Sequence, residues 1–170
     1  MVSLRPGRCY TPVKRAYTRK SKFKKSSFIK SVPPSKIVKF DYGNLTKKFA
    51  AEVNLVTKQA IQLRHNAIES ARTVIIRKLN PLGKNYHVKI RVFPHHVLRE
   101  NKMITGAGAD RMQTGMQKSF GRAVGLAARI KKGKTVFSIY LDKENVELAK
   151  AALKAATYRL PLRAEITVKQ

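Results

Sequence analysis

The uneven distribution of charge constrains this chain of 170 residues more than any other feature of its sequence. Its first 40 residues carry twelve lysines and arginines and no aspartate or glutamate. The whole chain has 37 basic and 9 acidic residues, which gives a formal net charge of +28 at pH 7. Because a surplus of this size repels itself in an isolated monomer, we expect a polyanionic partner that neutralises it. Nucleic acid is the first candidate for that partner.

Composition nevertheless allows a folded domain and excludes several classes of protein. Hydrophobic residues make up 43% of the chain, with seven Phe and six Tyr, which suffices for a core. No stretch reaches the ~18 to 20 uncharged apolar residues that a membrane helix needs, and residues 1–10 lack the apolar region of a signal peptide. The single Cys9 has no disulfide partner and no metal-binding neighbours, so we expect an inert thiol in a cytoplasmic protein.

The patterning divides the chain into two parts. Residues 1–35 contain four prolines and no helical apolar period, which predicts a basic RNA-binding arm that is extended and ordered only against a partner. Residues 36–170 fit a single domain. Within that domain, residues 94–133 show little periodicity, and five of the nine glycines fall between 106 and 125. This stretch predicts a long functional loop.

Hydrophobic periodicity predicts the elements of the domain. Alternating apolar and polar residues indicate strands at 37–40, 49–55, 86–93, 135–141 and 162–168. Apolar residues spaced by three and four indicate one helix at about 57–79 and a second that Asp142 caps and Pro161 ends. The predicted fold class is therefore α+β, a two-layer sandwich of a mixed or antiparallel sheet with two main helices. The strand at 86–93 presents Lys89 and Arg91 on its second face, which is expected to seek anions.

Catalytic and metal sites find little support in the sequence. The nine acids are scattered, and their one local group, at 142–147, is explained by helix capping. His95 and His96 are adjacent on an expected loop, without Cys, Asp or Glu at zinc-ligand spacing. Residues 106–110 (Gly-Ala-Gly-Ala-Asp) lack both the Walker lysine and the third glycine of a dinucleotide fingerprint. We therefore predict no enzymatic activity, no cofactor and no metal.

Features suited to RNA occur in the arm, the first helix and the glycine-rich loop. Tyr10 and Tyr17 lie among arginines and lysines, so rings can stack on unpaired bases while cations neutralise phosphates. Arg64 and His65 are either presented to a nucleic-acid groove or a loop backbone or, for Arg64, extended from the edge of the core toward solvent. The glycine-rich loop, flanked by basic residues, is either a close-approach surface for nucleic acid or simply flexible.

Several motifs resemble one protein family over nearly the whole chain. They are Arg5-Pro6-x-Arg8-Cys9-Tyr10, Arg64-His65-Asn66-Ala67, the run from Pro94 to Met103, the run from Gly106 to Met112, Gly115-Met116, Phe120-Gly121 and the run from Gly125 to Arg129. The sequence is similar to the universal large-subunit ribosomal protein family sixteen, in its archaeal and eukaryotic branch, also called ten-e. Because the chain ends at Gln170 without the extension of eukaryotic members, an archaeal protein is expected.

The resemblance implies a fold of the α/β-hammerhead type and a structural role in translation, without catalysis. The implied partners are large-subunit ribosomal RNA, the aminoacyl-site tRNA and neighbouring large-subunit proteins, with the protein a monomer within the cytoplasmic ribosome and not bound to a membrane. The loop at 102–112 would point toward the peptidyl-transferase centre and help to shape the aminoacyl-tRNA site, and Arg99 would anchor the base of the loop.

The candidate site residues form two groups. The expected rRNA-binding residues are Arg5, Arg8, Tyr10, Lys14, Arg15, Tyr17, Arg19, Lys20, Lys22, Lys24, Lys25, Arg64, His65, Arg91, His95, His96, Arg99, Lys118, Arg122 and Arg129. The expected tRNA-proximal loop residues are Lys102, Met103, Gly106, Gly108, Asp110, Arg111 and Met112, with Lys102 and Arg111 as the candidate contacts to tRNA.

Two other functions remain open at this point. A general nucleic-acid-compacting protein would account for the charge, and it would bind DNA as well as folded RNA. An RNA-modifying enzyme is permitted by the charge but lacks an acid/base constellation or a cofactor motif. If a ribosomal protein neutralises about eight phosphates, log K should fall with log salt at a slope of about −6 to −7.

Overall fold

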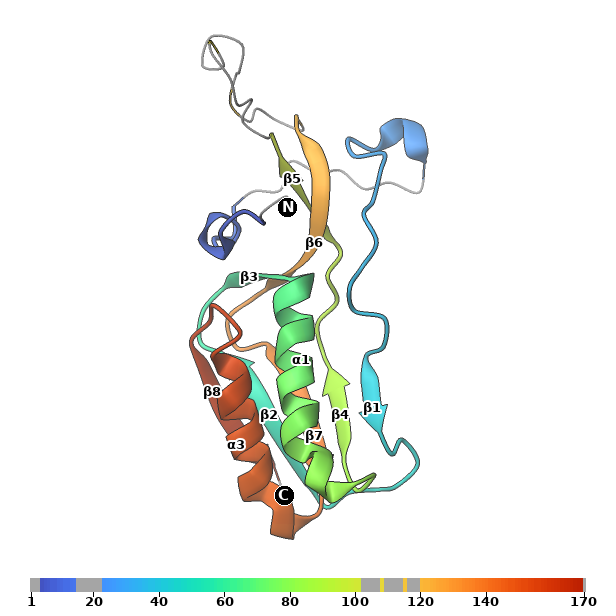
Figure 1. Cartoon of the computed structure of the whole chain (residues 1–170), viewed down its shortest axis with the longest axis vertical. Coiled ribbons are helices and arrows are strands. Elements are labelled where there is room, and N and C mark those ends of the chain that lie inside the picture. Colours follow the sequence, from blue (N-terminus) through green and yellow to red (C-terminus); the bar gives the residue numbers. More distant parts are fainter. Residues whose placement is uncertain (1–3, 15–22, 102–107, 109–114, 116–119, 170) are drawn as a thin grey trace.

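Two antiparallel sheets and two α-helices make up the described part of the computed structural model, which comprises residues 4–14, 23–101, 108, 115 and 120–169 (Figure 1). The strands are β1 (Asp41–Gly43), β2 (Ala51–Thr57), β3 (Ile61–Arg64), β4 (His87–Ile90), β5 (His96–Glu100), β6 (Arg122–Ile130), β7 (Thr135–Leu141) and β8 (Ala164–Lys169). The helices are α1 (His65–Leu79) and α3 (Val146–Thr157), with short 3-10 turns η1 (Gly7–Cys9), η2 (Lys24–Ser26), η3 (Asn80–Leu82) and η4 (Lys143–Asn145).

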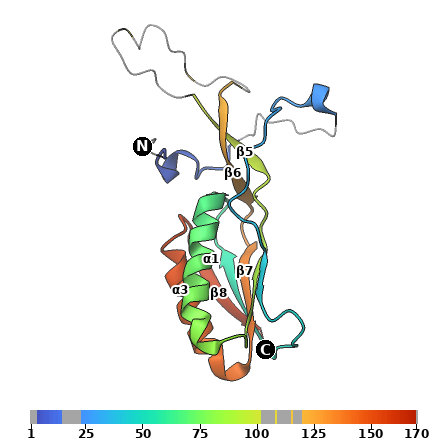
Figure 2. The same ribbon diagram turned by 45° about the vertical axis from the view of Figure 1, so that its right-hand side comes forward.

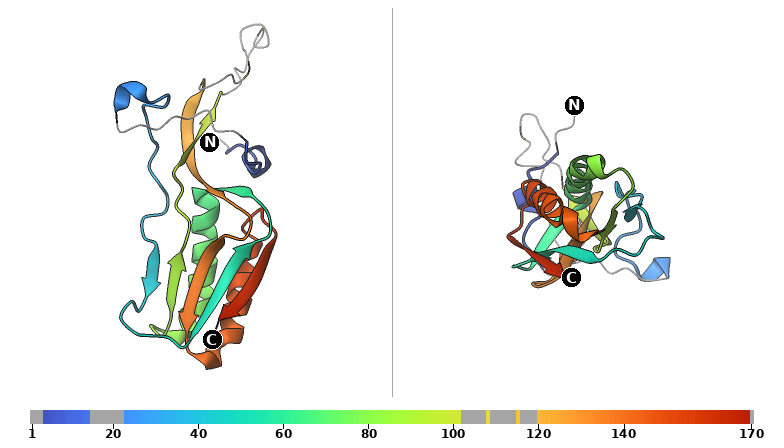
Figure 3. Two further views of the ribbon diagram at one scale, coloured as in Figure 1. Left: turned by 180° about the vertical axis from the view of Figure 1, so that it is seen from behind. Right: turned by 90° about the horizontal axis from the view of Figure 1, so that it is seen from below.

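The larger sheet and both helices form a two-layer unit, here called the body. Its five strands lie in the order β1-β4-β7-β2-β8, and each neighbouring pair is antiparallel. Helices α1 and α3 lie side by side across one face of the sheet (Figure 2). In the described residues the opposite face has no helix over it (Figure 3). The α+β two-layer fold is thus confirmed, with an antiparallel sheet.

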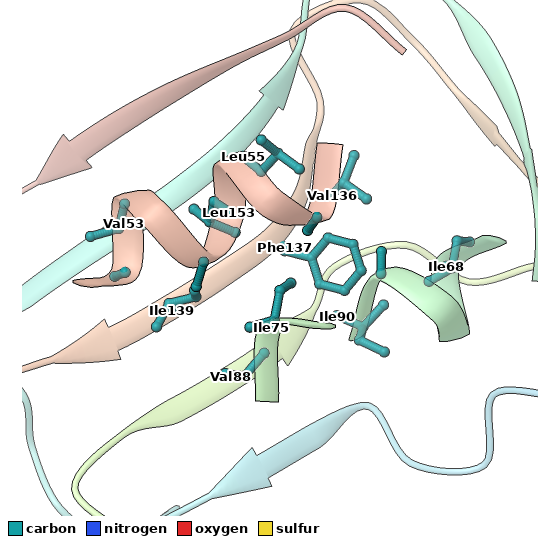
Figure 4. Packing of buried hydrophobic residues seen from close by; sticks show 14 of the residues in the cluster. Val53, Leu55, Ile68, Ile75, Val88, Ile90, Val136, Phe137, Ile139 and Leu153 are labelled. Carbon is teal, nitrogen blue, oxygen red and sulfur yellow. The ribbon is translucent and has the colours of Figure 1, made fainter. Parts of the chain in front are cut away.

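The hydrophobic core of the body lies between the sheet and the two helices (Figure 4). Phe137 of β7 is fully buried there, among Ile68 and Ile75 of α1 and Leu153 of α3. These side chains come from the alternating strand positions and the three-and-four helical positions that the periodicity identified. Burial of this apolar surface is the main stabilising contribution to the body.

The second sheet has the strand order β3-β6-β5 and is also antiparallel. Its strands β5 and β6, here called the ribbon, extend beyond the body at the end where the chain begins, and the C-terminus lies at the opposite end (Figure 1). A register shift between Leu98, which pairs with Gly125, and Arg99, which pairs with Ala123, marks a bulge at Val124 of β6. Bulges of this kind bend a ribbon and redirect side chains.

Two sequence predictions about this second sheet are wrong. The predicted helix at 57–79 is a strand, β3, followed by the shorter helix α1. The stretch at 94–133, predicted as a loop, contains β5 and β6, so His96 lies on a strand. The two errors have different causes. Strand β3 has only four residues, too few to show an alternation, and β6 consists largely of small residues (Ala123, Gly125, Ala127 and Ala128) instead of the alternating large apolar residues that identify a strand.

Smaller corrections concern element ends in the body. The strand predicted at 37–40 occurs instead at β1, although Ile37 is buried at 4% exposure without belonging to a strand. Helix α3 starts after η4 and ends at Thr157, before Pro161. Asp142 makes no side-chain capping bond, because its carboxylate pairs instead with the Lys47 ammonium at 2.8 Å. Strands β2, β4, β7 and β8 fall where the alternation predicts them.

Candidate nucleic-acid interface

The start of the chain, residues 4–14, lies against the second sheet and is here called the N-terminal segment. Its carbonyl oxygens accept hydrogen bonds from side chains and backbone of β3 and β6. Gln62 donates its backbone N–H to the Thr11 carbonyl at 3.0 Å and its side-chain amide to the Tyr10 carbonyl at 2.8 Å. Arg129 Nη2 donates to the Lys14 carbonyl at 2.7 Å. These bonds fix a basic segment that has few apolar residues of its own to bury.

Arg64 makes another hydrogen bond to the N-terminal segment. It ends β3 with extended backbone angles (φ −70°, ψ 147°) and occupies the N-cap position of α1. Its Nη1 donates to the Arg5 carbonyl at 2.9 Å, and its guanidinium carbon lies 5.6 Å from the centre of the Tyr10 ring. A Cβ at Gly7 would come within 3.2 Å of Arg64 Nη2, so glycine permits this close approach. Arg64 therefore anchors the N-terminal segment through its backbone, which is the loop-backbone alternative of the sequence interpretation.

His65, the first residue of α1, is held as a neutral ring. Its Nδ1 accepts the backbone N–H of Lys36 at 3.1 Å, which places the proton of the neutral ring on Nε2. Burial, followed by the nearby positive charges of Lys36 and Arg64, lowers the pKa of His65. A Cβ added at Gly125 would lie 3.5 Å from Nε2, so the ring edge faces β6.

A pocket of about 990 Å³, here called the ribbon pocket, opens between the N-terminal segment, the start of α1 and the ribbon. Its polar and charged lining includes Arg5, Tyr10, Arg64, His65, Asn66, Glu100, Asn101 and Arg122. Its apolar lining includes Leu4, Leu98, Phe120, Val124 and Leu126. The volume lies at the upper end of the range of small-ligand sites, and the lining combines cations with apolar surface.

Ion pairing separates this region from the body. Every ion pair within 4 Å in the described residues lies in the body: Lys47–Asp142, Lys58–Glu165, Arg72–Glu69, His87–Asp41, Lys89–Asp41, Arg91–Glu52 and Lys150–Glu147. The N-terminal segment and the second sheet, together called here the ribbon region, hold one carboxylate among the described residues, Glu100. Among the described residues, the cations of the ribbon region therefore outnumber its carboxylates, which favours an external anion as a partner.

The structure gathers several predicted RNA-binding residues in the ribbon region. Arg5, Arg8, Tyr10, Lys14, Arg64, Arg99, Arg122 and Arg129 belong to it, His65 borders it at the start of α1, and Arg5, Arg8, Lys14 and Arg122 are exposed. Arg99 Nη1 donates to the Phe120 carbonyl at 3.1 Å, which joins the two chain segments that border residues 102–119. His96 lies on β5, the exposed His95 immediately precedes it, and Lys25 is exposed on η2.

Arg91 lies apart from this group, just beyond β4, on the helix-free face of the body sheet. Its Nε donates to Ser138 Oγ at 3.0 Å, and its Nη2 reaches Glu52 Oε1 at 3.4 Å and the Tyr140 hydroxyl. Ser138 Oγ in turn donates to Asn54 Oδ1, which explains how Asn54 is buried at 4% exposure. The guanidinium of Arg91 thus has partners within the chain.

Other predicted residues fall outside the described part of the chain. These are Arg15, Tyr17, Arg19, Lys20, Lys22, Lys102, Met103, Gly106, Asp110, Arg111, Met112 and Lys118, together with the side chain of Lys24. Of the predicted tRNA-proximal residues, Gly108 is described, with a φ of +74° that favours glycine.

Sequence reasoning missed two residues of the interface, Gln62 and Glu100. Gln62 falls within the helix predicted at about 57–79, whereas on β3 its side chain donates to the Tyr10 carbonyl, 52 positions earlier in the chain. Glu100 Oε2 lies 3.5 Å from the Tyr10 hydroxyl, 90 positions away. Neither partnership leaves a local signal in the sequence.

No group of three or more His, Cys, Asp or Glu side chains among the described residues could hold a metal ion. Likewise, neither of the described α-helices is long and apolar enough to cross a membrane.

Comparison with known proteins identifies the family. The model of the family "Ribosomal protein L16p/L10e" matches residues 12–167. The large ribosomal subunit protein uL16 of Methanoculleus marisnigri is 48% identical over 165 residues, which cover 95% of this chain and 94% of that protein. The uL16 proteins of Staphylothermus marinus and Metallosphaera sedula are 47% and 46% identical, over 98% and 97% of this chain and 94% of each relative. This chain belongs to the ribosomal protein L16p/L10e family.

Proposed function

We propose that this protein is a structural constituent of the large ribosomal subunit that binds ribosomal RNA through the ribbon region and helps to shape the aminoacyl-tRNA site. Its family consists of ribosomal structural proteins, so it is not an enzyme. It acts in translation, on the cytoplasmic ribosome, beside other large-subunit proteins. The observation that carries the proposal is the separation of charge between a body with paired acids and a ribbon region with one described carboxylate.

Ribosomal RNA suits this separation of charge. Arginine side chains pair with phosphate oxygens in fork geometry, and binding releases the counterions that phosphates condense. Arg5, Arg8 and Arg122 are exposed and lie in the ribbon region, where the Tyr10 ring also offers an aromatic surface. Specificity then comes from the shape of folded RNA and its unpaired bases, because proteins cannot read the deep groove of an RNA duplex.

The aminoacyl-tRNA site is assigned to the loop at 102–112. Strands β5 and β6, which border residues 102–119 in the sequence, extend beyond the body, and the Arg99 side chain joins their far ends by its bond to the Phe120 carbonyl at 3.1 Å. A loop mounted on a closed ribbon can reach a partner at a distance from the core while the body stays fixed on RNA. Replacement of residues 102–112 by a short linker should spare incorporation into the subunit and impair tRNA handling.

The test of ribosomal assembly is sedimentation of a cell extract through sucrose gradients at low and high salt, with the protein followed by immunoblot. We expect it to migrate with large subunits and whole ribosomes and to resist moderate salt. Migration with DNA, or in the free fraction at all salt concentrations, would contradict the proposal and favour a general nucleic-acid-compacting protein.

A binding experiment separates these two functions further. Affinity of the full chain is measured for large-subunit ribosomal RNA and for duplex DNA of equal length across a range of salt concentrations. A ribosomal protein should prefer the folded RNA at every salt concentration, with a slope of log K against log salt near −6 to −7 for about eight phosphates. Equal affinities for RNA and DNA would contradict a specific role.

A further inference from the structure

The carboxylate of Glu100 is the exception in the ribbon pocket. It faces a site whose other charged side chains are Arg5, Arg64 and Arg122. A carboxylate beside RNA phosphates costs free energy through like-charge repulsion, so a site that only neutralised phosphates would do better without it. Its presence points to a ligand that also carries hydrogen-bond donors.

Glu100 has acceptor capacity that the described residues do not use. Its one hydrogen bond among them comes from the Tyr10 hydroxyl at 3.5 Å, a long contact. No ion pair of Glu100 occurs within the described part of the chain, whereas most body acids have one. An ionised carboxylate can accept about four hydrogen bonds, and burial followed by the charge of Glu100 raises the pKa of Tyr10, so that phenol remains a donor.

The rest of the pocket supplies what a nucleotide needs. Arg5 and Arg122 are exposed cations at its rim that can reach a phosphate. His65 contributes a neutral ring whose Nε2–H is a donor, because Nδ1 already accepts from Lys36. Phe120 and Val124, exposed at 56% and 45%, offer apolar surface on which a base can lie.

We propose that the ribbon pocket receives one unpaired guanine of the bound RNA, with Glu100 accepting hydrogen bonds from its Watson–Crick edge; this inference rests on the proposed function. Guanine presents two adjacent donors there, N1–H and N2–H, and the two carboxylate oxygens match this fork. Adenine, cytosine and uracil each place an acceptor next to their donor on that edge, which repels a carboxylate. The phosphate of the same nucleotide pairs with Arg5 or Arg122.

The experiment compares the full-length protein with Glu100→Gln on purified large-subunit ribosomal RNA. Unpaired guanines are probed with kethoxal, a reagent that forms an adduct with N1 and N2 and therefore reports that edge. Glu147→Gln is the matched control, because it makes the same change of charge on α3, at a side chain exposed at 84%. We expect the wild type and the control to protect one unpaired guanine that the Glu100→Gln complex leaves reactive.

The affinity for ribosomal RNA is a second measurement. It changes in opposite directions depending on whether Glu100 repels phosphates or binds guanine. Removal of a carboxylate that merely repels phosphates tightens RNA binding. Removal of one that binds guanine weakens it, by at least about fivefold, the lower end of what a good bidentate base contact contributes. Unchanged or tighter binding by Glu100→Gln, with the same guanines protected, would overturn the inference and leave the proposed function intact. Failure of the wild type to bind the RNA would overturn both.

A further variant separates base binding from support of the N-terminal segment. Tyr10→Phe removes the hydroxyl that bonds to Glu100 and keeps the carboxylate and the ring. If Glu100 binds guanine, Tyr10→Phe still protects that guanine. If Tyr10→Phe loses the protection as Glu100→Gln does, the carboxylate only positions Tyr10 and the inference is wrong. Thermal unfolding of each variant confirms that the chain is folded at the probing temperature.

Discussion

The body and the ribbon region are stabilised in different ways. The body buries a continuous apolar core and pairs most of its acids with cations inside the chain. The ribbon region extends beyond that core, exposes Phe120 and Val124, and leaves Arg5, Arg8 and Arg122 exposed. The difference indicates a body stabilised by its own core, and it supports the proposal that RNA neutralises the exposed cations of the ribbon region.

The body and the ribbon region also differ in their hydrogen bonds. In the body sheet, Arg91, Ser138 and Asn54 form a side-chain network that satisfies groups of neighbouring strands. In the ribbon region, Arg64, Gln62 and Arg129 donate to backbone carbonyls of a segment that has no core of its own. The first arrangement stabilises the sheet, whereas the second positions basic residues for a partner.

The largest expected effect is on the body. Phe137→Ala removes a fully buried ring from the centre of the core and should lower the free energy of unfolding by about 3 to 5 kcal/mol. Urea unfolding followed by circular dichroism measures it. The control is Val124→Ala in the ribbon, exposed at 45%, which should cost less than about 1 kcal/mol. Equal losses of unfolding free energy in the two variants would show that Val124 is as important to the core as Phe137. The contrast between the body and the ribbon would then be wrong.

An intermediate effect is expected where the two regions meet. Arg64→Ala leaves the Arg5 carbonyl without a charged donor, a loss of about 1.5 to 3 kcal/mol confined to the N-terminal segment. Amide hydrogen exchange should quicken in residues 4–14 and stay unchanged in β2 and β7. Arg77→Ala, at an exposed arginine of the same helix, is the control. Faster amide exchange throughout the body would contradict a hydrogen bond whose effect is confined to the N-terminal segment.

The smallest effect is a pH dependence from His65. The pKa of His65 is lowered in the folded chain, so the unfolded chain binds the proton more readily. The contribution of the neutral ring to the free energy of unfolding is therefore fully present above the ordinary pKa of about 6.5. As the pH falls from that value through the lowered pKa of the folded chain, this contribution is lost. His65→Gln should lose less stability than the wild type between pH 7 and pH 5. Equal losses for both proteins would mean that His65 does not titrate in this way.

The sequence predicted the elements whose pattern arises locally. Helix α3 has a buried and an exposed side, so its period is visible along the chain, and β7 is recognisable from its β-branched and aromatic residues although Val136 to Ile139 are all buried. Strand β6 instead consists largely of small residues, and β3 is only four residues long, so neither shows a distinctive pattern. The fold class was therefore predictable, and the second sheet was not.

The residues of the interface also differ in how far the sequence predicts them. Basic residues are visible in the sequence, so Arg5 and Arg122 could be predicted as RNA contacts, and that assignment remains a prediction. Which arginines have partners inside the chain depends on contacts across long separations, such as Arg64 with Arg5 and Arg91 with Ser138. The division of the chain into an arm at 1–35 and a domain at 36–170 also remains a prediction.

One measurement tests the central claim, that the ribbon region and not the body binds RNA. Two triple variants remove equal charge: Arg5, Arg8 and Arg122 changed to Gln in the ribbon region, and Lys58, Lys78 and Lys150 changed to Gln in the body. The salt dependence of binding to large-subunit ribosomal RNA is measured for both and for the wild type. We predict that the ribbon variant loses about 2 to 3 from the magnitude of the slope, while the body variant keeps the wild-type slope. Equal changes in the two variants would contradict the account and mark the protein as a nonspecific polycation.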